Sequence, residues 1–173
     1  MFCEITRTGI VASTARYLII FSTSIAFTQM TFAMDCGSEV TSIHLATQAE
    51  VDSFQATYGG GGTCDRVLGS LDISGEDITD LTPLQAIREI QGGLIVYRND
   101  SLTSLTGLSA LETVGLHLQI RENPALQNLD GLSSLATVVC TFYEPQRWSV
   151  WIRDNPSLLN IDGLSGITRT ECD

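Results

Sequence analysis

Residues 94–114 read LIVYRNDSLTSLTGLSALETV, and residues 118–138 repeat that pattern 24 positions later as LQIRENPALQNLDGLSSLATV. A fixed period in the range of roughly 20 to 50 residues is typical of solenoids, in which each coil buries its apolar side only against its neighbours. The repeat therefore predicts stacked coils. The positions that coincide are Asn99 with Asn123, Leu102 with Leu126, Leu105 with Leu129, Gly107 with Gly131, Leu108 with Leu132, and Leu111 with Leu135.

Weaker copies of the repeat flank this stretch. Residues 78–90 match it at the same offset of 24, and the segment before Ile78 is one residue short. Residues 150–167 match it at an offset of 32, so eight extra residues lie in the preceding run, 139–149. The predicted fold is mainly β: a short right-handed parallel β-helix or leucine-rich-repeat-like solenoid of about four to five coils with an N-terminal capping helix.

The strand of each coil is predicted to place alternate side chains inside and outside the solenoid. The expected core pairs are Leu71 and Ile73, Leu94 and Val96, Leu118 and Ile120, and Val150 and Ile152. The outward side chains then stack into two columns, since parallel strands lie about 4.8 Å apart. One column contains Asp72, Ile95, Gln119 and Trp151, and the other contains Ser74, Tyr97, Arg121 and Arg153.

The segment before the coils predicts a strand and one helix. Residues 42–45 alternate as a short strand does, and Thr47 with Glu50 has the spacing of a capping box. Apolar residues at helical spacing extend the predicted helix over residues 48–58, with Gly59 as its C′ residue. We expect this helix to cover the open end of the stack.

Residues 1–33 are predicted to be a cleavable secretory signal peptide. Arg7 and Arg16 precede an apolar run over 17–27, and residues 31–33 offer small side chains for cleavage. A membrane anchor is the alternative, but the uncharged run over 17–34 contains several Ser and Thr residues. We therefore expect a secreted, extracellular or cell-envelope protein without stable membrane insertion of the mature chain, organised as residues 34–63 (strand and capping helix) and 64–173 (solenoid) in one domain.

Export changes the interpretation of the cysteines. Removal of residues 1–33 leaves Cys36, Cys64, Cys140 and Cys172, an even number for an oxidising compartment. Three connectivities are open. Sequence proximity and the repeat layout favour Cys36 with Cys64 and Cys140 with Cys172, each closing a loop of about 30 residues, worth roughly 3 to 4 kcal/mol in the chain-entropy model.

Composition disfavours several functions. The formal charge is −11, which argues against nucleic-acid binding because an acidic surface repels phosphate groups. All nine basic residues are arginine. Nucleophile, zinc-hydrolase and phosphate-loop motifs are absent from the sequence, so we expect no enzyme and no cofactor. A β-helical glycosidase with outward acids such as Asp72 is the weaker alternative. The acids Glu76, Asp77 and Asp80 lack the spacing of a known calcium loop.

Aromatic and arginine side chains on one face and in the inserted run suggest a binding surface, because partner-binding surfaces are enriched in both. Stacking of Tyr97 on Arg121, and folding of the inserted aromatics over the last coil, are the structural alternatives. The candidate ligand-binding residues are Ile95, Tyr97, Gln119, Arg121, Phe142, Tyr143, Arg147, Trp148, Trp151 and Arg153.

The repeated asparagines Asn99, Asn123 and Asn155 are interpreted as turn residues that tolerate left-handed backbone and hydrogen-bond main-chain groups of the turns. Asn99 also begins an Asn-x-Ser pattern and is a glycosylation site if the host is eukaryotic. The charged residues that precede the asparagines, at 98, 122 and 154, are expected to pair in part across coils.

The Cys36-Gly37 pair, the predicted helix over 48–58, Cys64 before the first strand and the Asn-x-x-Leu-x-x-Leu-x-Gly-Leu cadence resemble the receptor L domain family. This family comprises the leucine-rich-repeat-like modules of insulin-receptor and epidermal-growth-factor-receptor ectodomains and of secreted microbial proteins. The resemblance implies a β-helix-like solenoid and extracellular recognition without catalysis. The contracted first coil and the insertion before the last coil depart from the family pattern, so its ligand surfaces are not carried over.

The sequence thus predicts a secreted or cell-surface recognition module whose ligand is a protein or a glycan. The alternative is a structural or adhesive extracellular repeat protein, or a fragment of a larger receptor-like protein.

Overall fold

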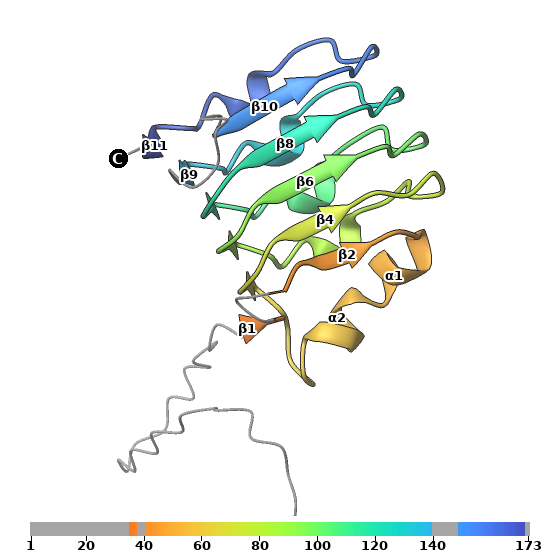
Figure 1. Cartoon of the computed structure of the whole chain (residues 1–173), viewed down its shortest axis with the longest axis vertical. Coiled ribbons are helices and arrows are strands. Elements are labelled where there is room, and N and C mark those ends of the chain that lie inside the picture. The colour runs from red at the N-terminus through yellow and green to blue at the C-terminus, as the bar shows by residue number, and fades with distance from the viewer. Residues whose placement is uncertain (1–34, 38–40, 140–148, 172–173) are drawn as a thin grey trace, which may run out of the picture. The chain divides into compact units, whose positions relative to one another are not determined.

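The computed structural model describes residues 35–37, 41–139 and 149–171, which form a mainly β solenoid with two parallel sheets (Figure 1). Each coil contributes one strand to each sheet, because the chain returns to the next rung after one repeat. The five-stranded sheet contains, in spatial order, β10 (Val150–Arg153), β8 (Leu118–Arg121), β6 (Leu94–Tyr97), β4 (Leu71–Ile73) and β2 (Ile43–Leu45). The six-stranded sheet contains β1 (Asp35–Cys36), β3 (Arg66–Val67), β5 (Glu89–Ile90), β7 (Thr113–Val114), β9 (Thr137–Val139) and β11 (Arg169–Glu171).

The third side of the solenoid is a stack of short 3₁₀ turns. Each turn begins where a leucine or isoleucine of the repeat enters the core, and neighbouring turns contact each other along the stack. Pro83 stands in the first of them, as expected of a residue whose φ is fixed for helical turns. The turns are η1 (Thr82–Leu84), η2 (Thr106–Leu108), η3 (Asp130–Leu132) and η4 (Asp162–Leu164).

The predicted register and core are confirmed over the inner coils. Leu94 pairs with Leu118, and Ile90 pairs with Val114, as the offset of 24 requires. The inward residues of β4, β6 and β8 are fully buried, whereas Val150 and Ile152 of β10 are only half-buried. One continuous column of aliphatic side chains therefore runs along the solenoid and is less well covered at β10.

The helical segment differs from the prediction of one helix over 48–58. The structure has two short helices, α1 (Gln48–Asp52) and α2 (Phe54–Tyr58), separated at Ser53. The Ser53 hydroxyl donates to the carbonyls of Ala49 and Glu50, the kind of local bond that bends or ends a helix. The predicted capping box of Thr47 and Glu50 is confirmed.

The backbone conformation after the helices also differs from the prediction. Gly59 has φ of −77°, so it is not the left-handed C′ residue that we predicted. The left-handed backbone follows at Gly60 and Gly61, with φ of 54° and 93°. The two helices lie beside β2 at the lower end of the stack in Figure 1 and contact β2 and η1.

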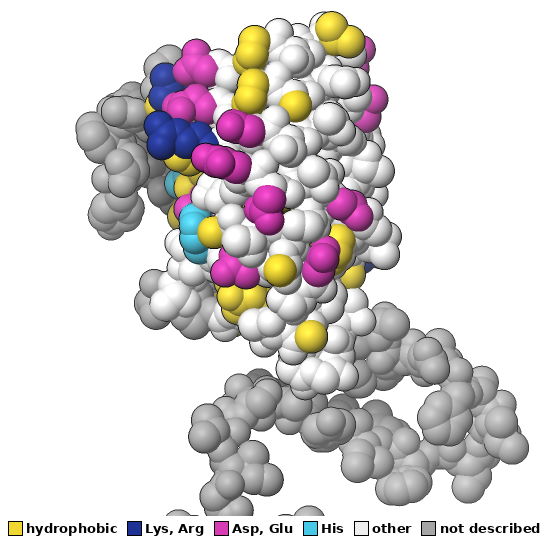
Figure 2. All heavy atoms as spheres, turned by 90° about the vertical axis from the view of Figure 1, so that its right-hand side faces the viewer, with side chains coloured by type: hydrophobic (Ala, Val, Ile, Leu, Met, Phe, Trp, Pro, Cys, Tyr) yellow, Lys and Arg dark blue, Asp and Glu magenta, His cyan; other side chains and the backbone are white. Residues whose placement is uncertain are grey.

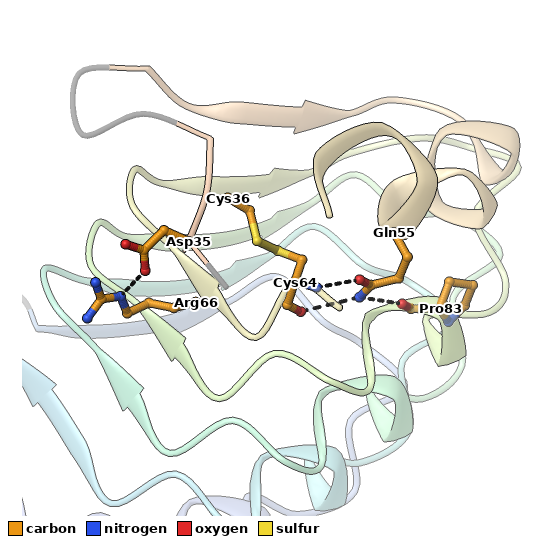
Figure 3. The surroundings of a disulfide bond; sticks show 6 residues. All are labelled: Asp35, Cys36, Gln55, Cys64, Arg66 and Pro83. Carbon is orange, nitrogen blue, oxygen red and sulfur yellow. Dashed lines mark hydrogen bonds and ion pairs between the residues drawn. A yellow bond between two sulfur atoms is a disulfide. The ribbon is translucent and has the colours of Figure 1, made fainter. Parts of the chain in front are cut away.

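A disulfide and one glutamine join the helices to the first coil (Figure 3). Cys36 and Cys64 are bonded, with their Cα atoms 5.8 Å apart, so the first predicted pairing is confirmed. The Gln55 carboxamide accepts from the Cys64 N–H at 2.7 Å and donates to the carbonyls of Cys64 and Pro83. Cys140 and Cys172 lie outside the described residues, and their pairing stays a prediction.

A ladder of asparagines closes the turns after β6, β8 and β10. The Asn123 Oδ1 accepts from the main-chain N–H of Asn99 at 3.1 Å and from its Nδ2 at 3.0 Å. Asn155 repeats both bonds to Asn123, at 3.0 and 3.1 Å. At the first rung, the Asn99 carboxamide accepts from Gly75 and donates to the carbonyl of Ile73. Each asparagine therefore satisfies main-chain groups of two coils at once.

The predicted hydrogen bonding of these asparagines to main-chain groups of the turns is confirmed, but the asparagines are not the left-handed residues. Positive φ occurs one residue earlier, at Arg98 (52°), Glu122 (57°) and Asp154 (55°). The left-handed residue turns the chain so that the following asparagine points into the core, where Asn99 and Asn123 are fully buried. Glycosylation of Asn99 is likewise incompatible with this fold, because its Nδ2 is buried and donates to three oxygens.

The glycine of each turn is required by the coil beneath it. A Cβ atom built on Gly131 would lie 1.9 Å from the carbonyl oxygen of Leu105, and Gly107 meets Leu81 in the same way. Main-chain atoms cannot yield as a flexible side chain does. Pro83 occupies the equivalent place in η1, where the helices and not a preceding coil lie beneath.

Replacement of Asn123 by alanine is expected to lower the free energy of unfolding by about 3 kcal/mol or more, because several buried main-chain groups lose their partners at about 1–3 kcal/mol each. Asn128→Ala is the matched control, because Asn128 Oδ1 makes one exposed turn bond to the Asp130 N–H. Urea unfolding of both variants measures the difference. Equal losses would contradict a special role for the buried ladder.

Gly131→Ala is expected to destabilise the protein by about 1–3 kcal/mol or more, because the added methyl group overpacks against the Leu105 carbonyl. Pro83→Ala removes atoms at the equivalent position of the first coil and serves as the control. Thermal melts followed by circular dichroism compare the two. A Gly131→Ala variant as stable as the parent would contradict this expectation, because it would show that the coils move apart to admit the methyl group without loss of stability.

Candidate functional site

The outward face of the five-stranded sheet carries the first predicted column. Strand register places His44, Asp72, Ile95, Gln119 and Trp151 on successive strands from β2 to β10. His44 Nδ1 lies 3.6 Å from an Asp72 carboxylate oxygen. The other side chains of the column are half-buried by their neighbours. The predicted column is therefore continuous and includes His44, which we had not assigned to it.

The second column brings Tyr97, Arg121 and Arg153 together on β6, β8 and β10. The Arg121 guanidinium carbon lies 3.6 Å from the centroid of the Tyr97 ring, so the expected stacking across coils is confirmed. Arg153 lies 4.7 Å from the ring of Trp151 on its own strand. Ser74 follows the end of β4 and is not part of the strand. Cation–π contacts therefore order the aromatic rings of this face.

A charged cluster centred on Glu122 borders the second column. Its carboxylate lies 3.1 Å from Arg98, 3.2 Å from Arg121 and 3.6 Å from Arg153. The hydrogen bond from Arg98, together with the charges of the other two arginines, lowers the pKa of Glu122 below its ordinary value. The predicted pairing across coils is thus confirmed for Arg98 and Glu122, while Asp154 pairs with Arg153 of its own strand at 3.1 Å.

Arg121 is the arginine of the cluster that is most covered. Its Nε is buried and has no hydrogen-bond partner within the described part of the chain. One Arg121 nitrogen is engaged by Glu122, and the π face of Tyr97 covers the guanidinium group. The contact with the ring offsets part of the cost of an unpaired donor.

An open groove of about 720 Å³ adjoins this cluster along the left-handed turns. The groove could not be predicted from the sequence, because its turn residues come together only when the coils stack. Figure 2 views this side of the molecule and shows basic side chains gathered next to acidic ones. The groove is lined by Glu76, Arg98, Asp100, Glu122, Pro124, Asp154 and Pro156.

The outward face of the six-stranded sheet is different in character. Its central outward column contains Glu89, Thr113 and Thr137, and beside it Arg88 pairs with Glu112 at 2.8 Å. These described strands present no aromatic side chain outward, and the ion pair is exposed. Arg66 and Arg169 stand at the two ends of this column, so arginines occur on both sheets, whereas the outward aromatic side chains of the described strands lie on the five-stranded sheet.

Several predicted residues lie elsewhere. Phe142, Tyr143, Arg147 and Trp148 lie outside the described residues, so their part in the site stays a prediction. The remaining candidates are brought together on one face: Ile95, Tyr97, Gln119, Arg121, Trp151 and Arg153.

Two of the three acids considered for calcium have structural partners, and the third, Glu76, lines the groove. Asp77 accepts from the Gln48 N–H, and Asp80 accepts from the N–H and hydroxyl of Thr82. The hydroxyl bond from Thr82 is the main cause of a lowered pKa of Asp80. No group of three or more metal-ligating side chains occurs over residues 35–37, 41–139 and 149–171. Over the same residues no helix has the length and apolar character to cross a membrane.

Comparison with known protein families gives one match. The model of the receptor L domain family matches residues 63–117, from the segment before β3 to the turn before β8, which confirms the resemblance predicted from the repeat. Neither the comparison with curated proteins nor that with solved structures gives a significant match.

The lowered pKa of Glu122 makes a pH-dependent contribution to stability. The ionised carboxylate is favoured in the fold, so this contribution is present above the ordinary Glu pKa of about 4.5 and is lost as the pH falls through the lower folded pKa. The melting-temperature difference between the parent and Glu122→Gln is therefore expected to shrink between neutral pH and pH values near 3. Arg98→Gln should reduce the same pH dependence, and a pH-independent difference would contradict the assignment.

Proposed function

We propose that this protein is an extracellular recognition module without catalytic activity, which binds a protein or glycan ligand through the outward face of its five-stranded sheet. The ligand-contacting residues are Ile95, Tyr97, Gln119, Arg121, Trp151 and Arg153, joined by the aromatic residues of the inserted run. Aromatic and arginine side chains supply most of the binding energy in known interfaces, because they bury a large area and donate directed hydrogen bonds.

The contrast between the two sheets is the observation that carries this proposal. Both sheets have outward columns in the same register, but the six-stranded sheet presents Thr113 and Thr137 where the five-stranded sheet presents Gln119 and the aromatic rings. Structural needs are the same for both columns, since each stacks at the same spacing. Stacking alone does not explain why the outward side chains of the two sheets differ, so we attribute the difference to ligand binding.

The setting of the module is consistent with this proposal. The Cys36–Cys64 disulfide indicates an oxidising compartment, and the receptor L domain match indicates an extracellular ligand-binding module. Residues 1–33 act as the secretory signal peptide in this proposal. Residues 34–173 form one domain of four to five coils, in which α1 and α2 cover the first coil and a Cys140–Cys172 bond fastens the last.

The groove extends the proposed surface beyond the sheet. Arg98 and Glu122 belong both to the groove and to the charged cluster beside Tyr97. The sheet face and the groove therefore form one continuous surface for a ligand. The arginines are held by carboxylates and rings before a ligand arrives. Such preorganisation lowers the entropy lost on binding.

A structural or adhesive role, alone or within a larger receptor-like protein, is the second candidate. The stacking of Tyr97 between Arg98 and Arg121 favours it, because those contacts satisfy the side chains without any ligand. This role predicts no discrete saturable ligand, so a binding experiment separates the two functions.

The test is a screen of the secreted protein against arrayed glycans and secreted proteins, followed by titration of any ligand with variants. Trp151→Ala and Gln119→Ala are expected to weaken binding at least about tenfold, as loss of a central contact of 1.4 kcal/mol or more does. Thr113→Ala and Thr137→Ala, on the other sheet in equivalent coils, are the matched controls and should leave affinity unchanged.

Two results would overturn the proposal. The first is a parent protein that retains no ligand in a saturable manner, which favours the structural role. The second is a ligand whose affinity falls with the Thr113 and Thr137 variants but not with those of Gln119 and Trp151. Circular dichroism of each variant confirms that the fold is kept.

A further inference from the structure

The last coil exposes apolar side chains at positions that are covered in the coils before it. Ile161 is 56% exposed, whereas its counterpart Leu129 is fully buried. Figure 2 shows hydrophobic side chains at the upper end of the molecule, where the β10 coil ends the stack. We name these residues the C-terminal end surface: Ile152, Leu158, Ile161, Leu164 and Ile167, with Leu159 at its outer rim.

Leu159 shows that this surface is more than an unfinished core. Its N–H donates to the carbonyl of Gln127, whose own N–H donates to Thr103, so the three residues are register equivalents. Thr103 and Gln127 are polar and exposed, and they face solvent on the outside of the solenoid. In the last coil the same outward position carries a leucine that is 83% exposed. The repeat pattern does not require an apolar residue there.

The main chain is also unpaired at this end. Within the described residues β10 pairs only with β8, and β11 pairs only with β9. The asparagine ladder stops as well, because no described side chain accepts from the Asn155 N–H as Asn155 accepts from that of Asn123. β10 contains neither proline nor lysine, which natural edge strands use to prevent pairing with another chain.

The opposite end of the stack cannot receive this surface. There α1 and α2 lie against β2 and η1, so a second copy cannot add its last coil beneath the first coil of another. Between the ends of two stacks, only the equivalent C-terminal end surfaces of two identical chains are therefore left to meet. Contacts of this kind have twofold symmetry and close after two copies.

The sequence of β10 is self-complementary in that arrangement. Antiparallel pairing centred on Ile152 places Ile152 of the two copies together on the core side of the sheet. It places Trp151 opposite Arg153 of the second copy on the outward side, twice by symmetry, since opposed residues in an antiparallel pair share a face. Arg153 already contacts the Trp151 ring within one chain, at 4.7 Å, so the pair is chemically suited.

We propose that the protein forms a twofold dimer through its C-terminal end surface, with the β10 strands of two copies paired antiparallel into one continuous sheet. The partner is a second copy of this chain. The two outward faces of the five-stranded sheets then join, so that one dimer presents a ten-stranded surface.

The test measures molar mass by light scattering and sedimentation over a range of concentrations, using protein recovered from secretion of the full-length chain. The parent is expected to have twice the monomer mass. Ile161→Asp places a charge in the contact and Leu159→Asp places one at its rim. Ile161→Asp should raise the dimer dissociation constant at least about tenfold, which corresponds to 1.4 kcal/mol. Gln127→Asp adds the same charge at the register equivalent of Leu159 one coil earlier and should leave the dimer intact.

Ile161→Asp decides the outcome, because Ile161 is 56% exposed and its side chain lies in the contact. If Ile161→Asp fails to fold, Ile161→Ser decides instead, because it removes the same apolar contact without adding a charge. A monomeric parent at all concentrations would overturn the proposal. So would a dimer that survives the Ile161 variant or that dissociates equally in Gln127→Asp. Hydrogen exchange of the β10 amides is the second measurement: protection should rise with concentration, and concentration-independent protection in a monomer would show that the chain covers this edge itself.

Discussion

The hydrogen bonds of the buried asparagines are the interaction on which the rest of the structure depends. Stacked coils must turn sharply after each strand, and the turn leaves main-chain groups in the core that water cannot reach. Asn99 and Asn123 satisfy those groups within their own coil and in the coil beside it. Because each carboxamide bonds to the next, the coils are held at one register, and every other column in the molecule follows from it.

The outward charges and rings follow directly from that constraint. A left-handed residue must precede each asparagine, which brings Arg98, Glu122 and Asp154 to the rim in successive coils. The rim forms the wall of the groove and supplies the carboxylate that holds the arginines of the neighbouring column. The candidate site is therefore built from the same turns that close the fold, and its charges are held in place by rigid backbone.

The solenoid scaffold could be predicted from the sequence, because the sequence repeats with a fixed period. The offset of 24 fixed the pairing of Leu94 with Leu118, and the alternation within each strand fixed which side chains are buried. Prediction from the sequence failed where a residue type has two chemically reasonable roles. Asparagine suits left-handed turns as well as buried ladders, and the residue types of Arg98 and Glu122 do not mark the left-handed position, because neither type favours positive φ. Ser53 divided the predicted helix for a similar reason, since its hydroxyl competes with the helical bonds.

By itself the sequence determined the mainly β solenoid, its core and the two outward columns, because these depend on spacing along the chain. It favoured the Cys36–Cys64 pairing among three possible connectivities, and the structure decided it. Only the tertiary structure decided that the asparagines are buried, that the rim residues enclose a groove, and that the last coil exposes Leu159 and Ile161. Those features depend on which groups of different coils meet and which groups find no neighbour. A repeat gives the same residues in every coil, whereas burial depends on whether another coil lies above.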